Sequence, residues 1–245
     1  MARVRSLTSF IAIWSERQIT FRTLGAESGC SGGQFPDCRP PDPNARAWCA
    51  GAISSYSPSL VMLIVTTERL ILRHWEQSDR EPFSRMNADP RVMEFMPSLL
   101  SRDESDTLVD HIEWHFREHG FGLCAVELRQ GHSFIGYIGL AVPRFQAIFT
   151  PCVEIGWRLS AEYWGRGLAT EGAREIARYA FGNLGFEDLV SFTVPGNWRS
   201  RRVMEKLGMT HNSVEDFDHP NLPLEHPFRR HVLYRLTHTE FESAL

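Results

Sequence analysis

Apolar residues alternate with polar or small residues along positions 153–159, which is the period-two pattern of a strand with one buried face. Along positions 169–180 apolar residues recur every three or four places instead, which predicts an amphipathic helix. Gly165 and Gly167 lie between the two patterns, where a strand has to turn into a helix. The sequence therefore predicts a strand, a glycine turn and a helix in succession, and we expect the other elements to pack around this unit.

The residues after position 61 carry further periodic segments, which glycine, proline and asparagine separate. The segments of period two predict strands at 63–72, 121–128, 134–142, 189–194, 209–214 and 231–236. The segments with helical spacing predict helices at 78–87, 102–119 and 197–207, the last capped by Asn197 and ended by Gly208. In chain order this gives β-α-α-β-β-β-α-β-α-β-β, which predicts a single α/β (α+β) domain with a mixed central sheet and helices on both faces.

Residues 1–61 differ from the rest because glycine, proline and serine interrupt any apolar periodicity. Such a segment lacks the apolar surface to fold on its own. We therefore expect a disordered or non-native N-terminal extension over residues 1–61 and one folded domain over residues 62–245. Met62, directly before the first predicted strand, is a candidate start of the translated chain.

Composition narrows the class of protein without identifying it. The 245 residues are 42% hydrophobic and 23% charged, as in ordinary globular proteins. A formal net charge of -4 recruits neither nucleic acid nor an acidic membrane surface, and no apolar run approaches the roughly 20 residues of a membrane span. The five cysteines form no CxxC pair, which favours a reducing compartment over a disulfide framework. We expect a cytoplasmic protein, monomeric or homodimeric, without nucleic-acid or membrane partners.

The glycine turn is the first candidate for chemistry. The N–H groups at the start of a helix have no intrahelical partner and point outward with the positive end of the helix dipole. Gly165 and Gly167 let a ligand approach the backbone closely, so the turn suits a phosphate or pyrophosphate; a plain tight turn is the alternative. A nicotinamide dinucleotide site requires a third glycine where Thr170 stands and an acidic residue within 192–194, and the sequence has neither.

Two motifs make the chain resemble the GNAT superfamily of N-acetyltransferases. That superfamily binds pyrophosphate with Gln/Arg-x-x-Gly-x-Gly/Ala; here Gly167 and Ala169 occupy the last two fixed positions, and Trp164 occupies the first. The aromatic residue departs from this consensus but is similar to the branch of ribosomal-protein-alanine N-acetyltransferases, in which Tyr-Trp-Gly-Lys/Arg-Gly is usual. The segment 197–209 resembles the second motif of that branch, Asn-x-x-Ser followed by Glu-Lys-Leu-Gly-Phe. The resemblance covers residues 63–237.

This resemblance implies acetyl-CoA as the donor and a primary amine as the acceptor, which attacks the thioester directly in a ternary complex, with no metal ion. It also implies a sheet that splays between its fourth and fifth strands, predicted at 153–159 and 189–194, so that pantetheine pairs with free backbone groups. A free N–H near Ile155 or Gly156 would then polarise the thioester carbonyl. The cofactor-binding residues expected from the resemblance are Ile155, Gly156, Trp157, Trp164, Gly165, Arg166, Gly167, Leu168, Ala169, Thr170, Asn197, Ser200 and Arg202.

Glu154 is the carboxylate nearest the expected thioester, and an amine must lose its proton before it attacks. We expect Glu154 to be the general base; a solvated glutamate, or one paired with Arg158, is the alternative. Ser200 is the candidate donor to the leaving thiolate, or else a first-turn helix residue with local hydrogen bonds. Many superfamily members place a tyrosine acid where Met204 stands, so a catalytically weak CoA-binding or sensing module is the alternative function.

Other residue groups are weaker candidates. His111, His115 and His119 share one helix face that could hold a metal, but a solvent-exposed face is the better interpretation. Arg202, with the arginines beside it, is a candidate for the 3′-phosphate of CoA. Residues 215–226 contain carboxylates and histidines, and we expect them to form a flexible flap that attracts a cationic amine.

Overall fold

The computed structural model describes residues 65–244, and the predicted N-terminal extension, residues 1–61, lies outside the described residues. The strands are β1 (Val65–Thr66), β2 (Leu70–Arg73), β3 (Leu123–Leu128), β4 (Phe134–Ala141), β5 (Glu154–Leu159), β6 (Asp188–Thr193), β7 (Thr210–His211), β8 (Phe217–Asp218) and β9 (Arg230–Thr237). The helices are α1 (Arg80–Asn87), α2 (Arg102–His119), α3 (Leu168–Gly182), α4 (Trp198–Lys206) and α5 (His238–Ser243), with short 3-10 helices η2 (Gln77–Asp79), η3 (Ala161–Tyr163) and η4 (Ser213–Glu215).

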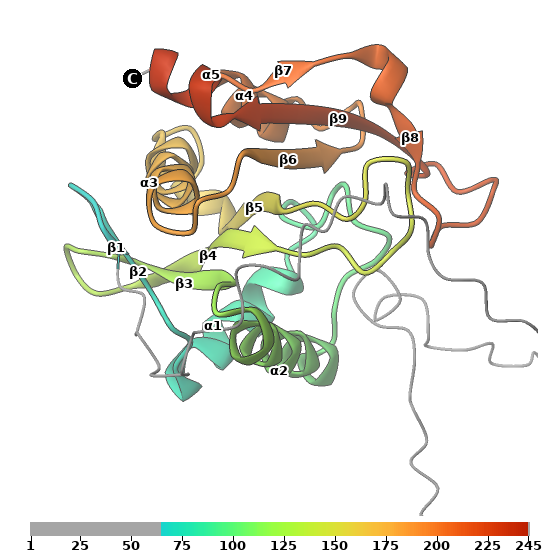
Figure 1. Ribbon diagram of the computed structural model, residues 1–245. Coiled ribbons are helices and arrows are strands. Elements are labelled where there is room, and N and C mark those ends of the chain that lie inside the picture. The colour runs from blue at the N-terminus through green and yellow to red at the C-terminus, as the bar shows by residue number, and fades with distance from the viewer. Residues whose placement is uncertain (1–64, 245) are drawn as a thin grey trace, which may run out of the picture. The chain divides into compact units, whose positions relative to one another are not determined.

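One mixed sheet runs through the described residues in the order β1-β2-β3-β4-β5-β6-β9-β7, with β8 paired to β9. Figure 1 shows α1 and α2 against one face of this sheet and α3 against the other. Both α4 and α5 lie beside α3: Arg174 donates to the Lys206 carbonyl at the end of α4 (3.0 Å), and Phe181 contacts Phe241 of α5. This arrangement confirms the predicted α/β fold with a mixed central sheet and helices on both faces.

Side chains of the central strands alternate between the two helical layers. On the α3 side, Gly172 lets the helix approach β4 so closely that a Cβ there would lie 2.5 Å from Cδ1 of Ile138. On the α1 side, the ring of Phe83 packs edge-on against Tyr137 of the same strand. Ile155 of β5 is fully buried. The period-two pattern that predicts these strands is therefore the pattern of a sheet covered on both faces.

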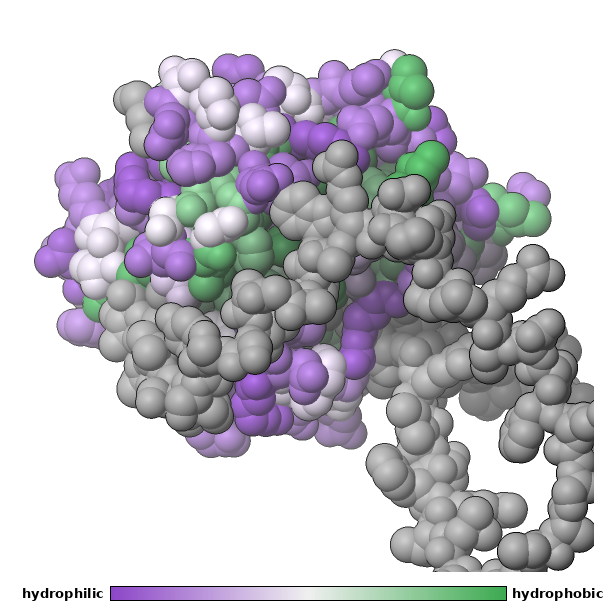
Figure 2. Space-filling model, viewed as in Figure 1, coloured by the Kyte–Doolittle hydropathy of each residue, from purple (hydrophilic) through white to green (hydrophobic). Residues whose placement is uncertain are grey.

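The central strands β5 and β6 separate almost as soon as they pair. They run parallel and share one bridge, Glu154 with Val190, where the Val190 N–H donates to the Val153 carbonyl (2.9 Å). Beyond it, β6 pairs only with β9 and β5 only with β4. This is the splay expected between the two strands. On the face drawn in Figure 2, apolar residues gather in the middle, over the region of β4 to β6, and hydrophilic residues surround them.

Side-chain caps fix the helix boundaries. At the start of α2 the Ser101 hydroxyl accepts from the Glu104 N–H, and the Glu104 carboxylate accepts from the Ser101 N–H (2.8 Å). At the start of α4 the Asn197 side chain accepts from the Ser200 N–H (3.2 Å), as predicted, and Gly208 follows the helix with a φ of 86°. The predicted helices 102–119 and 197–207 are therefore correct to within one residue.

Three parts of the fold differ from the prediction. The predicted strand 209–214 is a strand only in β7, and the chain then enters η4. The predicted opening strand is a hairpin of β1 and β2, because the Thr67 hydroxyl accepts from the Leu70 N–H (2.8 Å) and turns the chain. The short strand β8 and the helix α5 are absent from the prediction, although α5 begins at a capping box formed by Thr237 and Glu240. None of the helices within residues 65–244 is long and apolar enough to cross a bilayer.

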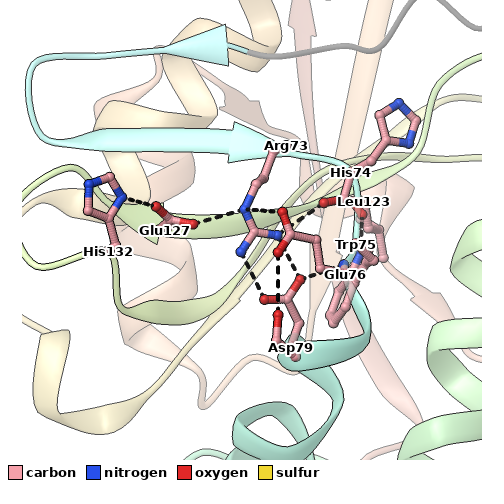
Figure 3. A network of polar contacts seen from close by, with 9 residues as sticks. Arg73, His74, Trp75, Glu76, Asp79, Leu123, Glu127 and His132 are labelled. Atoms are coloured by element: carbon pink, nitrogen blue, oxygen red, sulfur yellow. Dashed lines mark hydrogen bonds and ion pairs between the residues drawn. The ribbon is translucent and has the colours of Figure 1, made fainter.

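A network of charged side chains ties β2 to the start of α1 and to β3 (Figure 3). Arg73, whose side chain is 14% exposed, donates to both carboxylate oxygens of Asp79 (2.7 and 2.9 Å) and to Glu127 (2.9 Å). Glu127 also bonds to Nδ1 of His132 in the turn between β3 and β4. We call these four residues the Arg73 network, in which each carboxylate has a cationic partner.

Candidate active site

The predicted glycine turn lies between η3 and α3. Gly165 and Gly167 have φ values of 74° and 77°, in a left-handed region that glycine enters without strain. Gly167 is the N-cap of α3, and no side chain among the described residues caps this helix. The N–H groups of residues 168–170 therefore have no intrahelical partner, which is the geometry of an anion site.

A pocket, which we call the turn pocket, opens at this turn. Residues of the turn, of β5 and of α4 line it. Every expected cofactor-binding residue except Ile155, Gly156 and Arg166 is among them. Residues 157–170 and 197–206, which are distant in the sequence, are thus brought together at one site.

Arg166 supports the turn from outside this pocket. Its carbonyl accepts from Nη1 of Arg69 (2.9 Å), and Arg69 pairs with Glu171 in the first turn of α3 (2.6 Å). Glu171 also accepts from the Thr67 hydroxyl (2.5 Å). These contacts anchor the glycine turn to the β1–β2 hairpin, so the segment 67–69 positions the turn.

Trp164 has a structural reason for departing from the superfamily consensus. Its indole N–H donates to the carbonyl of Leu159, the last residue of β5 (2.8 Å). The guanidinium of Arg199 lies 4.6 Å from the Trp164 ring centre and also pairs with Glu94. Trp164 therefore closes the end of β5 and forms a wall of the turn pocket.

A second pocket, which we call the Glu154 pocket, adjoins the splay between β5 and β6. It is lined by α2, by β5 and β6, and by residues of the segments 142–145 and 219–231. Trp157, Arg158 and Ser200 line both pockets. The two pockets therefore meet at the splay, and a ligand in one can contact a ligand in the other.

Glu154 is half-buried in this second pocket and makes no hydrogen bond or ion pair with any residue in the described part of the chain. Its carboxylate lies next to Gly156: a Cβ placed on Gly156 would be 3.8 Å from Oε1 of Glu154. Arg158 donates instead to Oδ1 of Asn87 (2.9 Å), so the alternative of a Glu154–Arg158 pair is wrong. Burial raises the pKa of Glu154 to about 8, close to the pH at which a general base has to gain and lose a proton.

The free N–H groups of β5 begin one residue later than predicted. Successive residues of a strand direct their backbone N–H and C=O groups to opposite sides. The Val153 carbonyl accepts from β6 at the bridge, so the backbone groups of Ile155 and Trp157 also point toward β6, and those of Gly156 point toward β4. Gly156 is accordingly paired with Gly139 of β4, which corrects its expected role as a donor. Ile155 adjoins the bridge, so the first N–H beyond it is that of Trp157.

The residues expected from α4 occupy different surroundings. Ser200 lies in the first turn of α4, and its backbone N–H donates to Oδ1 of Asn197 (3.2 Å); this bond is the helix cap made by Asn197 and does not involve the Ser200 hydroxyl. Ser200 nevertheless lines both pockets. Arg202 lines the turn pocket with a side chain that is 68% exposed and 3.7 Å from Glu205. Its charge is therefore available to an anion at the rim.

The histidine face of α2 is partly structural. His115 is buried: its Nδ1 bonds to the Phe121 carbonyl (2.9 Å), and its Nε2 accepts from the Val142 N–H (3.0 Å). Burial lowers the pKa of His115 to about 4. The interpretation as a solvent-exposed face is therefore wrong for His115, which ties α2 to the residues just before β3 and just after β4. Within residues 65–244 no group of three or more potential ligands could hold a metal ion.

The expectation of a free acidic flap is wrong for the first part of the segment 215–226. Glu215 pairs with Arg235 of β9 (2.7 Å), and Asp218 pairs with Arg229 (3.3 Å). The strand β8 within this segment is also hydrogen-bonded to β9. These carboxylates are therefore engaged, and the segment contributes His219 to the Glu154 pocket instead.

The pocket also contains two histidines: His219, which belongs to the segment 215–226 expected beside the acceptor, and His231, which sequence reasoning missed. His219 is 2% exposed, its Nδ1 accepts from the Asn221 N–H (3.3 Å), and its buried Nε2 has no partner. The ring of His231 lies 5.2 Å from that of His219. Burial lowers the pKa of both histidines, that of His219 to about 4. No spacing in the sequence links His231 to β5, so no local signal could have found it.

Comparison with known proteins gives the family. Residues 69–210 match the model of the acetyltransferase (GNAT) domain. The chain is 35% identical over 159 residues to an FsC-acetyl coenzyme A-N(2)-transacetylase from Aspergillus fumigatus, a match that covers 62% of this chain and 66% of that protein. A crystal structure of an acetyltransferase from Agrobacterium tumefaciens is similar with 27% identity and a TM-score of 0.58, over 71% of this chain and 94% of that one. A ribosomal-protein alanine acetyltransferase from Vibrio fischeri, 16% identical, shares the fold with a TM-score of 0.56, over 71% of this chain and 96% of that one.

The chain belongs to the GNAT acetyltransferase family, because the family model matches more than half of its length. It is accordingly an acetyl-CoA-dependent N-acetyltransferase. The site fits acetyl-CoA: the N–H groups at the start of α3 match a pyrophosphate, and the free edge of β5 matches the amide groups of pantetheine.

Proposed function

We propose that this enzyme transfers the acetyl group directly from acetyl-CoA to a primary amine while both are bound. The observation that carries the proposal is the meeting of the two pockets at the splay, with Glu154 unpaired in one and the glycine turn in the other. A covalent acetyl-enzyme is less well supported, because burial raises the pKa of Cys124 and Cys152 to about 12 and leaves both as poor nucleophiles.

The residues take the following roles in this proposal. The N–H groups of residues 168–170 hold the pyrophosphate, and the Trp157 N–H donates to the thioester oxygen as the carbonyl carbon becomes tetrahedral. Glu154 takes the proton of the attacking amine, directly or through a water molecule. The C–N bond forms as the carbonyl carbon becomes tetrahedral. The C–S bond breaks as the carbonyl re-forms, and the thiolate leaves with a hydrogen bond from Ser200.

The alternative is a CoA-binding or sensing module with little turnover, and one residue favours it. Met204, 1% exposed, occupies the place where many superfamily members have a tyrosine acid. A thiolate, however, is a stable leaving group that needs little help from an acid. We therefore favour the enzyme over the sensing module.

Thiol release from acetyl-CoA with a panel of primary amines, combined with mass spectrometry of the products, tests the proposal. Direct attack predicts that release requires the amine and that reciprocal plots for the two substrates intersect. The protein incubated with acetyl-CoA alone should keep its intact mass, and a gain of one acetyl group would contradict direct attack. CoA binding without any amine-dependent thiol release would establish the alternative.

The role of the glycine turn has its own test with a matched control. Gly167→Asp places a negative charge against the pyrophosphate, so CoA affinity measured by calorimetry should fall roughly 100-fold, about 3 kcal/mol. Gly185 has a similar φ of 70° and lies outside both pockets, so Gly185→Asp introduces the same backbone strain elsewhere. Equal CoA affinity in the two variants would remove the turn from the cofactor site.

A further inference from the structure

Arg158 carries a positive charge that its surroundings do not balance. Nη1 donates to Oδ1 of Asn87 (2.9 Å), Nη2 contacts the thioether sulfur of Met96 (3.5 Å), and the guanidinium carbon lies 5.5 Å from the Tyr137 ring centre. Its Nε is buried without a partner, and no carboxylate within residues 65–244 forms an ion pair with it. A guanidinium does not lose its proton in proteins, so the charge persists at this half-buried position.

The missing partner is an anion that arrives with a ligand. Arg158 lines both pockets, so either substrate of the proposed reaction could supply this anion. Acetyl-CoA carries its negative charges on phosphates, which the glycine turn can accommodate, and its pantetheine arm is uncharged. The anion that Arg158 lacks is therefore expected on the acceptor.

The rest of the Glu154 pocket restricts the acceptor further. Aromatic side chains make up much of its lining, among them Phe95, Tyr137, Phe145, Phe192 and Phe228. The carboxylates that line it are Glu104 and Glu154. A polyamine or an aminoglycoside carries several positive charges and would have to bring one of them toward Arg158. The pocket is better suited to a single amine on an apolar body that also bears a negative charge.

We propose that Arg158 binds a carboxylate group of the acceptor, and that the acceptor is an apolar amino acid or another amine that bears a carboxylate. A carboxylate accepts two N–H groups from one guanidinium, and Arg158 lines the pocket without a carboxylate partner among residues 65–244. The proposal rests on the proposed function, because it assigns the acceptor of that reaction. Arg158 is thereby a specificity-determining residue, and Glu154 receives the proton from the amine of the same molecule.

A binding experiment tests this subsite without any turnover. The protein saturated with CoA is titrated calorimetrically with 3-phenylpropionate, which has a carboxylate and no amine, and with 3-phenylpropanamide, its neutral match. We expect the carboxylate to bind about 10-fold more tightly, Arg158→Gln to abolish that difference, and Arg158→Lys to restore part of it. Arg85→Gln, at an exposed arginine outside both pockets, is the matched control and should change neither affinity.

Two results would overturn the subsite. One is equal binding of the two compounds to the unaltered protein, and the other is an equal loss of both in Arg158→Gln. A fall in CoA affinity in Arg158→Gln, with the preference for the carboxylate retained, would also overturn it, because Arg158 would then serve the cofactor.

A kinetic comparison separates this inference from the proposed function. With L-phenylalanine and L-phenylalaninamide as acceptors, Arg158→Gln should raise the KM for the amino acid roughly 10-fold and leave that for the amide nearly unchanged. Carboxylate binding through Arg158 without amine-dependent thiol release would support the subsite and refute the proposed function. Equally fast acetylation of the amide and the amino acid by the unaltered protein would refute the subsite and support the function.

Discussion

Arg73 and Arg158 are both largely withdrawn from water near α1, yet their surroundings are opposite. The guanidinium of Arg73 donates to two carboxylates and to the His74 carbonyl, as Figure 3 shows. The guanidinium of Arg158 has one amide oxygen and one thioether sulfur, and its Nε has nothing. The same contrast separates Glu127, which bonds to Arg73 and to His132, from Glu154, which has no hydrogen bond or ion pair within residues 65–244.

This difference distinguishes a charge that serves the fold from a charge that serves a ligand. A hydrogen bond with Asp79 raises the pKa of Arg73 even further above neutrality. Burial raises the pKa of Glu127, but its bonds to His132 and Arg73 outweigh burial and lower it overall. No partner opposes burial at Glu154, so its pKa shifts upward. A carboxyl whose pKa is lowered stabilises the scaffold as an anion, whereas one whose pKa is raised toward neutrality is ready to exchange a proton.

The largest effect is expected where the unpaired carboxyl is removed. Glu154→Gln keeps the shape of the side chain but cannot accept a proton, so turnover should fall roughly 10²–10⁴-fold with little change in CoA affinity. Steady-state kinetics and calorimetry measure the two quantities separately. Turnover close to that of the wild type would mean that solvent or another residue takes the proton.

The pH profile of the same variant tests the reason for that loss. Glu154 accepts a proton only when ionised, and with a pKa of about 8 its ionised fraction grows through neutral pH. For the wild type, kcat/KM should therefore rise about tenfold per pH unit below pH 8 and level off above it, whereas Glu154→Gln should lack this rise. An acceptor amine whose pKa lies below the whole pH range measured is already neutral there and keeps its own ionisation out of the profile.

The next effect concerns stability and the Arg73 network. Arg73→Met removes the guanidinium from the buried carboxylates of Asp79 and Glu127, so the free energy of unfolding should fall by about 3–5 kcal/mol. Arg85→Met removes an exposed arginine paired with Glu81 and should cost less than about 1 kcal/mol. Urea unfolding measures both values, and turnover per folded molecule should stay unchanged. Equal costs for the two variants would show that the buried network adds nothing to an exposed pair.

A smaller effect links the pKa of Glu154 to stability. The folded state keeps this proton up to about pH 8, whereas the ordinary pKa of the group is 4.5, so between these values the folded protein binds more protons than the unfolded one. Stability from the neutral carboxyl is therefore fully present below pH 4.5 and is lost as the pH rises toward about 8. Glu154→Gln should match the wild-type Tm at pH 5 and exceed it at pH 8.5, by roughly 2–4 °C for each kcal/mol that the ionised carboxyl costs the folded state. Identical melting curves at pH 8.5 would argue against a desolvated carboxyl.

The smallest effect is expected at the edge of the Arg73 network. His132 bonds to Glu127 with a side chain that is 73% exposed, so solvent can replace much of this contact. His132→Ala should lower the free energy of unfolding by less than about 1 kcal/mol, as measured by urea unfolding. A loss as large as that of Arg73→Met would mean that the network acts as one unit and not through its buried arginine.

Much of the fold is predictable because local signals agree with the tertiary structure. The helices α2 and α4 begin at side-chain caps, Ser101 and Asn197, and their predicted ends lie within one residue of those observed. The β1–β2 hairpin is not predictable in this way, because a hydroxyl bond at Thr67 makes its turn in a run without glycine or proline. The helix α5 has a capping box at Thr237, which is also the last residue of β9. The strand pattern of β9 therefore hides the start of this helix in the sequence.

The site is predictable only where it leaves a local signal. Gly165 and Gly167 lie between a strand pattern and a helix pattern, and Glu154 places a charge within an apolar strand. Each of these features can be recognised in the sequence alone. His115 is misinterpreted because both of its hydrogen-bond partners lie outside its helix. The significance of Arg158 is the absence of a partner, which depends on where the other charged groups lie in space and not on any spacing along the chain.

The single bridge between β5 and β6 also determines how the molecule comes apart. Among the described strands, β1 to β5 and β6 to β9 are joined through backbone pairing only at Glu154 and Val190. Cooperative opening spreads along hydrogen-bonded ladders, so the two halves of the sheet should exchange their amide protons as separate units. Acetyl-CoA lying between β5 and β6 would act as the strand that the sheet lacks, and would join the two halves into one exchange-protected unit for as long as it is bound.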